Sequence, residues 1–125
     1  MTDAAEPTAH WPVEIKVKSA EKVLEIVFDD YRAFTLPAEL LRVESPSAEV
    51  KGHGVGQKRI IPGRRHVGIM EVEPVGNYAI KIKFDDLHDT GIFSWNYLRH
   101  LGENQATIWQ TYLDKLAEQG LSRDP

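Results

Sequence analysis

Apolar and polar residues alternate along short stretches of this chain, which is the pattern of β-strands with one buried face. In residues 12–18, Val13, Ile15 and Val17 alternate with charged side chains, so we expect these three to face the interior. Similar alternation, bounded by turn dipeptides such as Gly76-Asn77, predicts the remaining strands. The expected strands cover residues 12–18, 23–28, 33–36, 66–75, 78–84 and 91–95, and a further short strand at 58–61 stays open.

The apolar spacing changes to a helical period in other parts of the chain. Pro37 followed by good helix formers predicts a short helix over residues 37–43, which must end before Pro46. A second helix is expected over residues 94–104, with Ser94 as its N-cap and Gly102 as its C-terminal stop.

The last helix is expected over residues 104–120, with Gly120 ending it. Its apolar residues fall on one stripe, which is typical of a helix packed against a core. The residues of this stripe are Ile108, Trp109, Tyr112, Leu113 and Leu116.

The order of these elements predicts an α+β fold. We expect a mainly antiparallel β-sheet, with one short helix after the third strand and two C-terminal helices. A length of 125 residues is close to the commonest domain size, so we expect one domain over residues 11–120. Residues 1–10 are expected to form a disordered N-terminal tail, and residues 121–125 a C-terminal tail.

The composition narrows the function. Hydrophobic residues make up 42% of the chain and charged residues 27%, as in ordinary soluble proteins. The chain has no cysteine, so disulfides, thiol nucleophiles and thiolate metal sites are excluded. No apolar run approaches the roughly 20 residues of a membrane-spanning helix, and the first residues do not resemble a secretion signal. We therefore expect a cytoplasmic protein without membrane contact.

Charge is distributed unevenly along the chain. The net charge is −4, but residues 51–66, which we name the basic loop, contain Lys51, Lys58, Arg59, Arg64 and Arg65 and no acidic residue. The acidic total and the lack of aromatic residues in this loop disfavour nucleic acid. A protein or a small anionic ligand is the expected partner. The alternative is a solvated loop whose charges are balanced by nearby acids.

The glycines of the basic loop invite comparison with a phosphate-binding loop. That motif requires Gly-x-x-x-x-Gly-Lys-Ser/Thr between a strand and a helix. Here Gly52 and Gly56 are one residue too close, and Gln57 precedes Lys58. The glycines are more simply explained by a tight loop.

Histidines and aspartates gather in and beside two loops. They suggest a metal site or an acid–base pair, although the dense carboxylates lack the spacing of a calcium-binding EF-hand. The alternative is a polar turn between two strands. The residues concerned are His53, His66, Asp85, Asp86, His88 and Asp89.

Several motifs together resemble a known family. Ser-Pro-Ser follows a leucine-arginine pair, and Gly-His-Gly, Gly-Asn-Tyr and Asp-Asp-x-His-Asp-x-Gly-Ile-x-Ser-Trp follow in that order. With these motifs the chain resembles the small bacterial DUF971 family. That domain of unknown function is related to the N-terminal domain of gamma-butyrobetaine hydroxylase and trimethyllysine dioxygenase. The resemblance covers residues 13–103.

The resemblance implies a zinc position that this chain does not keep. The dioxygenases bind structural zinc through a Cys-Pro-Cys-x-x-Cys run and a later histidine. The matching positions here are Ser45, Ser47, Val50 and His88. Neutral hydroxyls and a valine do not replace thiolates as zinc ligands, so we expect no metal and no cofactor. His88 is expected to make a hydrogen bond instead.

The resemblance also limits the activity. The catalytic iron of those dioxygenases lies in a separate, larger domain, so we do not transfer their activity to this chain. Related domains also occur fused to P-loop ATPases that carry iron–sulfur clusters. This leaves one alternative function, a metal- or ligand-binding accessory component of iron–sulfur or 2-oxoglutarate dioxygenase-related pathways.

The leading hypothesis is a non-catalytic binding or adaptor domain with the basic loop as its contact surface. We assign no catalytic residue; a small enzyme would require a pocket that joins His53, His88 and an arginine. The candidate contact residues are His53, Lys58, Arg59, Arg64, Arg65 and His88.

Overall fold

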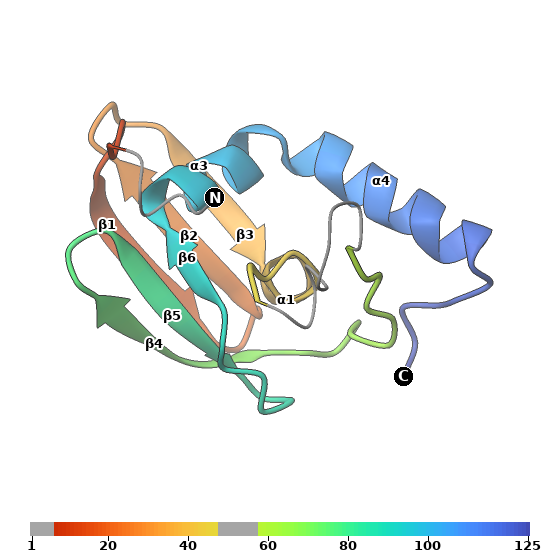
Figure 1. Ribbon diagram of the computed structural model, residues 1–125. Coiled ribbons are helices and arrows are strands. Elements are labelled where there is room, and N and C mark those ends of the chain that lie inside the picture. The colour runs from red at the N-terminus through yellow and green to blue at the C-terminus, as the bar shows by residue number, and fades with distance from the viewer. Residues whose placement is uncertain (1–6, 48–57) are drawn as a thin grey trace.

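The computed structural model describes residues 7–47 and 58–125. Its elements follow the predicted order of strands, a short helix, strands and two helices (Figure 1). They are β1 (Pro12–Lys18), β2 (Val23–Phe28), β3 (Ala33–Pro37), α1 (Ala38–Val43), β4 (Ile69–Val75), β5 (Ala79–Phe84), β6 (Ile92–Ser94), α3 (Trp95–Glu103) and α4 (Gln105–Glu118). The α+β fold class is confirmed.

The strands form two antiparallel three-stranded sheets, in the orders β1-β2-β3 and β4-β5-β6. Alternation along β2 buries Leu24, Ile26 and Phe28 completely, and alternation along β5 buries Ile82 and Phe84 in the same way. The apolar face of each sheet therefore follows directly from the period of two.

The prediction for Val13 is wrong. A β-bulge between Pro12 and Glu14 shifts the register of β1, and the Val13 side chain is 64% exposed. Ile15 and Val17 pack against the core as expected. An extra residue in one strand reverses the side-chain alternation on one side of it, and the sequence pattern does not reveal where it occurs.

The two C-terminal helices, α3 and α4, have four boundaries, and three of them agree with the prediction. The Ser94 hydroxyl accepts a hydrogen bond from the Tyr97 N–H at 3.0 Å and so caps α3. Gly120, with φ +66°, follows the end of α4. Gly102 does not stop α3, which continues to Glu103. Its function is close packing, because a Cβ there would lie 2.5 Å from Cγ of Phe34 on β3.

The core has two parts. The main part lies where both sheets meet α1 and α3, and contains most of the fully buried apolar side chains. A smaller cluster of Val43, Ile61, Tyr112 and Leu116 joins the end of α1, the segment before Pro62 and α4. Residues 58–61 form no strand. Among the described residues no helix is long and apolar enough to cross a membrane.

The last residues of the chain contact distant segments. The Gly63 N–H donates to the Ser122 carbonyl at 2.9 Å, and the Arg65 N–H donates to the Arg123 carbonyl at 3.0 Å. Arg123 donates to both carboxylate oxygens of Glu39 on α1, at 2.9 and 2.7 Å. Figure 1 shows this segment returning beneath α4 toward the residues that precede β4.

Candidate functional site

Most described cations of the basic loop are paired within the protein. Lys58 Nζ lies 2.6 Å from Oε1 of Glu44, Arg64 Nε lies 2.8 Å from Oδ2 of Asp86, and Arg65 Nε lies 2.5 Å from Oδ1 of Asp124. These ion pairs agree with the alternative expectation that nearby acidic residues balance the positive charges of the basic loop. Arg59 is exposed. His53 and Lys51 lie outside the described residues.

His88 and Arg64 line the same shallow pocket of about 380 Å³, together with Arg42 and Asp86. Asp86 joins the two arginines, because Nε of Arg42 lies 2.7 Å from the same Oδ2 that Arg64 approaches. The other oxygen of Asp86 accepts the His88 backbone N–H at 3.2 Å. Two distant segments, those of Arg42 and Arg64, are thereby joined to the turn that contains Asp86 and His88.

The electrostatics of this carboxylate favour its ionised form. Burial alone would raise the pKa of Asp86. Hydrogen bonds from Arg42 and from the His88 N–H, with the charges of Arg42 and Arg64, outweigh that effect and lower the pKa below its ordinary value. Arg42 is 2% exposed, so the ion pair fixes a buried guanidinium.

The residues at the implied zinc position do not fit the metal. The Ser45 hydroxyl and Nε2 of His88 lie 3.0 Å apart in a hydrogen bond, and the buried Ser47 hydroxyl has no hydrogen-bond partner among the described residues. Both serines offer neutral oxygens, whereas structural zinc takes thiolates and imidazoles. Val50 lies outside the described residues. The expectation that His88 makes a hydrogen bond is confirmed.

The contact between Ser45 and His88 has the distance of a nucleophile and its base. Ser45, however, is 1% exposed, and a Cβ added to Gly91 would overlap its hydroxyl oxygen. No space remains beside that oxygen for a substrate carbonyl. The geometry therefore indicates a structural hydrogen bond.

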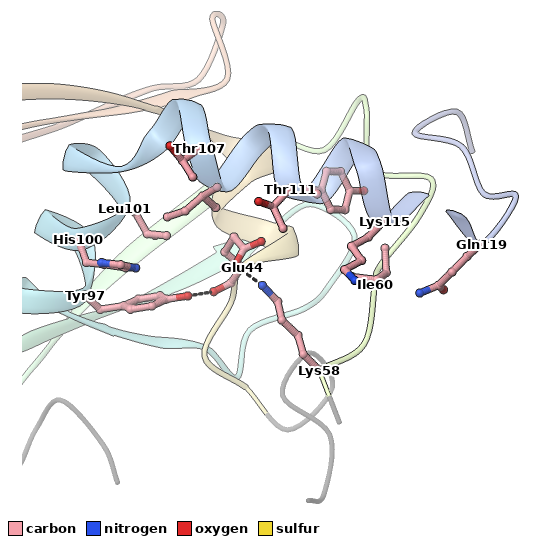
Figure 2. Close-up of a pocket in the computed structure, with 12 residues that line it drawn as sticks. Glu44, Lys58, Ile60, Tyr97, His100, Leu101, Thr107, Thr111, Lys115 and Gln119 are labelled. Atoms are coloured by element: carbon pink, nitrogen blue, oxygen red, sulfur yellow. Dashed lines mark hydrogen bonds and ion pairs between the residues drawn. The ribbon is translucent and has the colours of Figure 1, made fainter. Parts of the chain in front are cut away.

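A larger cavity, of about 540 Å³, opens along one side of α4 (Figure 2). We name it the α4 cavity. Its α4 wall contains two parallel rows with a spacing of four residues, which places each row on one face of the helix. One row consists of Thr107, Thr111, Lys115 and Gln119, and the other of Ile108 and Tyr112.

The opposite wall and the floor come from three other segments. They are formed by Glu44 after α1, by Lys58 and Ile60 of the basic loop, and by Tyr97, His100 and Leu101 of α3. Figure 2 shows Lys58 reaching toward Glu44 across the mouth of the cavity. Of the sequence candidates, Lys58 alone lines this cavity among the described residues.

Two tyrosines line the cavity, and the hydroxyl of each is hydrogen-bonded to a backbone carbonyl. The Tyr97 hydroxyl donates to the Glu44 carbonyl at 2.5 Å, and the Tyr112 hydroxyl donates to the Ile61 carbonyl at 2.6 Å. Burial raises the pKa of Tyr112 to about 12, so it stays a neutral donor. The two rings form apolar walls.

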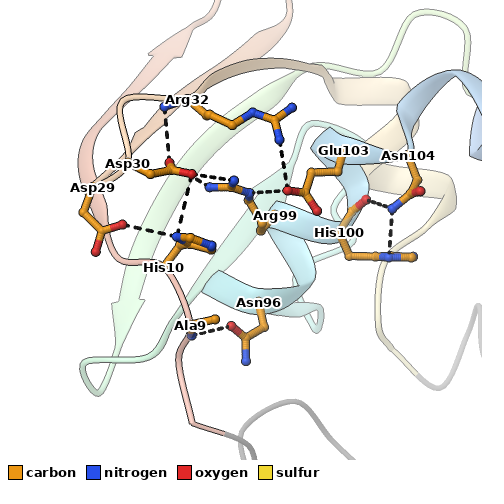
Figure 3. A network of polar contacts seen from close by, with 10 residues as sticks. All are labelled: Ala9, His10, Asp29, Asp30, Arg32, Asn96, Arg99, His100, Glu103 and Asn104. Carbon is orange, nitrogen blue, oxygen red and sulfur yellow. Dashed lines mark hydrogen bonds and ion pairs between the residues drawn. The ribbon is translucent and has the colours of Figure 1, made fainter.

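A further polar cluster lies around Arg99 of α3 (Figure 3). Arg99 donates to both oxygens of Asp30, at 2.9 and 2.7 Å, and to Glu103 at 2.8 Å. These hydrogen bonds from Arg99 hold the pKa of Asp30 well below its ordinary value. His10 and Asp29 are near enough to share a cation with Asp30. Asp30 is already engaged by Arg99, so we assign this cluster a structural function.

The sequence contains the pattern that builds the α4 cavity, although the helical spacing alone predicts only a face packed against the core. The helical spacing indicated that Ile108 and Tyr112 face the core, and Tyr112 is indeed 3% exposed. The adjacent row of Thr107, Thr111 and Lys115 has the same spacing, and all of its members can donate hydrogen bonds. A polar row beside an apolar one is the sequence signal for this wall.

Comparison with known proteins identifies relatives for most of the chain. The family model described as gamma-butyrobetaine hydroxylase-like, N-terminal, matches residues 15–99. No curated protein gives a significant match.

Solved structures give close matches. One solution structure is 45% identical with a TM-score of 0.82 and covers 93% of this chain and 91% of its own. A second is 44% identical with a TM-score of 0.81, covering 100% and 92%. A crystal structure of a DUF971 protein of unknown function from Acidithiobacillus ferrooxidans is 41% identical with a TM-score of 0.62, covering 73% and 91%.

Proposed function

Since residues 15–99 match its model, the chain belongs to the gamma-butyrobetaine hydroxylase-like N-terminal family, and from this premise we propose that it is a non-catalytic binding domain. The domain binds an anionic group of its partner in the α4 cavity. The observation that carries this proposal is the cavity itself, which joins the end of the basic loop to a row of hydrogen-bond donors on α4.

The paired charges of the basic loop favour the cavity over the loop surface as the contact. Lys58, Arg64 and Arg65 each have a carboxylate partner, so a ligand would have to displace an internal ion pair. Within the part of the chain that the structure describes, Lys115 on the cavity wall is paired only with Glu118 of its own helix, at 3.7 Å and with both side chains about half exposed or more. Such exposed pairs are weak and exchange readily.

Two of the described histidines, His88 and His100, support a non-catalytic function. His88 is hydrogen-bonded to a serine without room for a substrate. His100 stacks on the ring of Tyr97, with centroids 6.2 Å apart, and approaches the side-chain amide of Asn104. Both rings are therefore engaged by neighbours within the protein.

Quantitative affinity capture from an extract of the source cells tests the proposal. We expect Lys115→Glu to abolish capture of the partner, because it replaces the available cation of the cavity by an anion. Arg59→Glu separates the two candidate surfaces, since Arg59 is exposed on the basic loop. Lys18→Glu on β1, another exposed lysine with one carboxylate partner, is the control.

The outcomes distinguish the alternatives. Loss of capture with Lys115→Glu alone supports the cavity, and loss with Arg59→Glu alone transfers the contact to the basic loop. Capture that survives both substitutions and high salt contradicts an anionic contact on either surface.

The alternative of a metal-binding accessory component has a direct test. Elemental analysis of protein purified without an affinity tag is expected to show no stoichiometric metal, because Ser45 and His88 are engaged with each other. A stoichiometric ion that disappears on His88→Ala would restore this alternative.

A further inference from the structure

We infer that the ligand of the α4 cavity is a small organic carboxylate with an apolar body, an inference that rests on the proposed function above. It follows from three properties of the cavity as its described residues form it: apolar walls, one lysine whose ion pair is long and exposed, and a row of hydrogen-bond donors beside that lysine. The first two properties exclude classes of ligand, and the third places the charged group of the ligand.

The apolar walls require an apolar body. Ile60, Leu101 and Ile108 line the cavity together with the rings of Tyr97 and Tyr112, whose hydroxyls are already bonded to backbone carbonyls. A volume of about 540 Å³ is typical of sites for small molecules. A bare inorganic anion would leave these walls uncovered.

The charge balance selects a monoanion. The Glu44 carboxylate is nearly buried and is neutralised by Lys58 at 2.6 Å. Its negative charge is therefore already balanced, which also removes the attraction for a cationic ligand. Lys115 remains as the one lysine of the cavity whose pairing is long and exposed. One available ammonium matches a carboxylate better than a phosphate dianion.

The donor row places the carboxylate along α4. Thr111 precedes Lys115 by one turn and Gln119 follows it by one turn, so a hydroxyl, an ammonium and an amide lie in line. Figure 2 shows Thr111 and Lys115 directed into the cavity, with Lys58 across from them. A carboxylate beside Lys115 would accept from the ammonium and from the Thr111 hydroxyl.

Titration of ¹⁵N-labelled full-length protein with three matched probes tests the inference. 3-Phenylpropanoate has both the apolar body and the charge, 3-phenylpropanamide lacks the charge, and acetate lacks the apolar body. We expect saturable shift changes at the amides of Leu101, Thr111 and Lys115 with 3-phenylpropanoate, and about tenfold weaker binding by each of the others.

Variants assign the effect to individual side chains. Lys115→Gln is expected to weaken 3-phenylpropanoate about tenfold and to leave 3-phenylpropanamide unchanged. Thr111→Val is expected to weaken the carboxylate severalfold. Lys18→Gln is the matched control, since Lys18 is similarly exposed and has one carboxylate partner, Glu25, at 3.2 Å. The amide spectrum of each variant reports its folding.

A fourth titrant separates this inference from the proposed function. A short peptide with several glutamates represents an acidic protein segment. Tighter binding of that peptide, with the same dependence on Lys115, overturns the small-molecule assignment and leaves an anion-binding domain. Equal binding of acid and amide, or binding unaffected by Lys115→Gln, also overturns the inference. The absence of binding by every anion, with capture independent of Lys115, overturns both.

Discussion

At the scale of single residues, Asp86 is the side chain whose loss has the clearest expected effect. Asp86→Asn removes the carboxylate that Arg42 and Arg64 approach at 2.7 and 2.8 Å, while Arg42 stays buried. Because the Asp86 side chain is 22% exposed, we expect a loss of about 2 kcal/mol in unfolding free energy, less than for a fully buried pair. Urea denaturation measures it.

Asp89→Asn is the control, because Asp89 is exposed on the rim of the same shallow pocket. We expect it to change the unfolding free energy by less than about 0.5 kcal/mol. Equal effects of the two substitutions would show that the carboxylate of Asp86 has no special function.

The same carboxylate predicts a pH dependence. The pKa of Asp86 is lowered in the folded protein, so its contribution is fully present above the ordinary aspartate pKa and is lost as pH falls through the lowered pKa of the folded state. We therefore expect wild type and Asp86→Asn to differ most near neutral pH and to begin to converge only below about pH 4. Denaturation series at several pH values check this, and a gap constant down to pH 2 would contradict it.

At the scale of elements, the packing of α3 on β3 depends on Gly102. Gly102→Ala improves helix propensity by about 1 kcal/mol, but its Cβ would lie 2.5 Å from Cγ of Phe34. We expect the overlap to prevail, with a net loss of roughly 1 to 3 kcal/mol. Thermal and urea denaturation measure the loss.

A double-mutant cycle provides the control. Phe34→Leu reduces the ring that the new methyl group meets, so Gly102→Ala is expected to cost less in that background than in the wild type. Additive effects would show that the contact with Phe34 is not the cause.

The strands and helices also show which features of the fold can be predicted from local sequence patterns. The period of two predicted β2 and β5, and the N-cap of α3 was assigned from Ser94 alone. The errors at Val13 and Gly102 have a common physical cause. A bulge and a close helix–strand contact are selected by packing between distant segments, which local alternation does not encode.

At the scale of the whole molecule, the candidate site joins segments that are far apart in the sequence. The basic loop was predicted from its charge, and Lys58 does line the α4 cavity. The partners of that charge were not predictable, because Glu44, Asp86 and Asp124 approach the loop only through the tertiary fold. The charges along a sequence indicate which residues can bind anions. They do not indicate which of those residues are already paired with carboxylates of the same protein.

The last five residues test whether contacts between distant segments stabilise the domain. Arg123 binds both oxygens of Glu39, whose side chain is 7% exposed, and its guanidinium lies 5.2 Å from the ring centroid of Trp109. Arg123→Gln leaves a buried carboxylate without its cation, so we expect a loss of about 3 kcal/mol in unfolding free energy. Arg65→Gln breaks an exposed pair with Asp124 and should cost less than about 1 kcal/mol.

Neutralising both partners should restore much of the loss. In Glu39→Gln/Arg123→Gln no unpaired charge remains buried, so the double variant is expected to be more stable than Arg123→Gln alone. Urea denaturation of the four proteins in the cycle measures the coupling. If Arg123→Gln costs no more than Arg65→Gln, the C-terminal residues act as a tail, and their hydrogen bonds to Gly63 and Arg65 do not stabilise the domain.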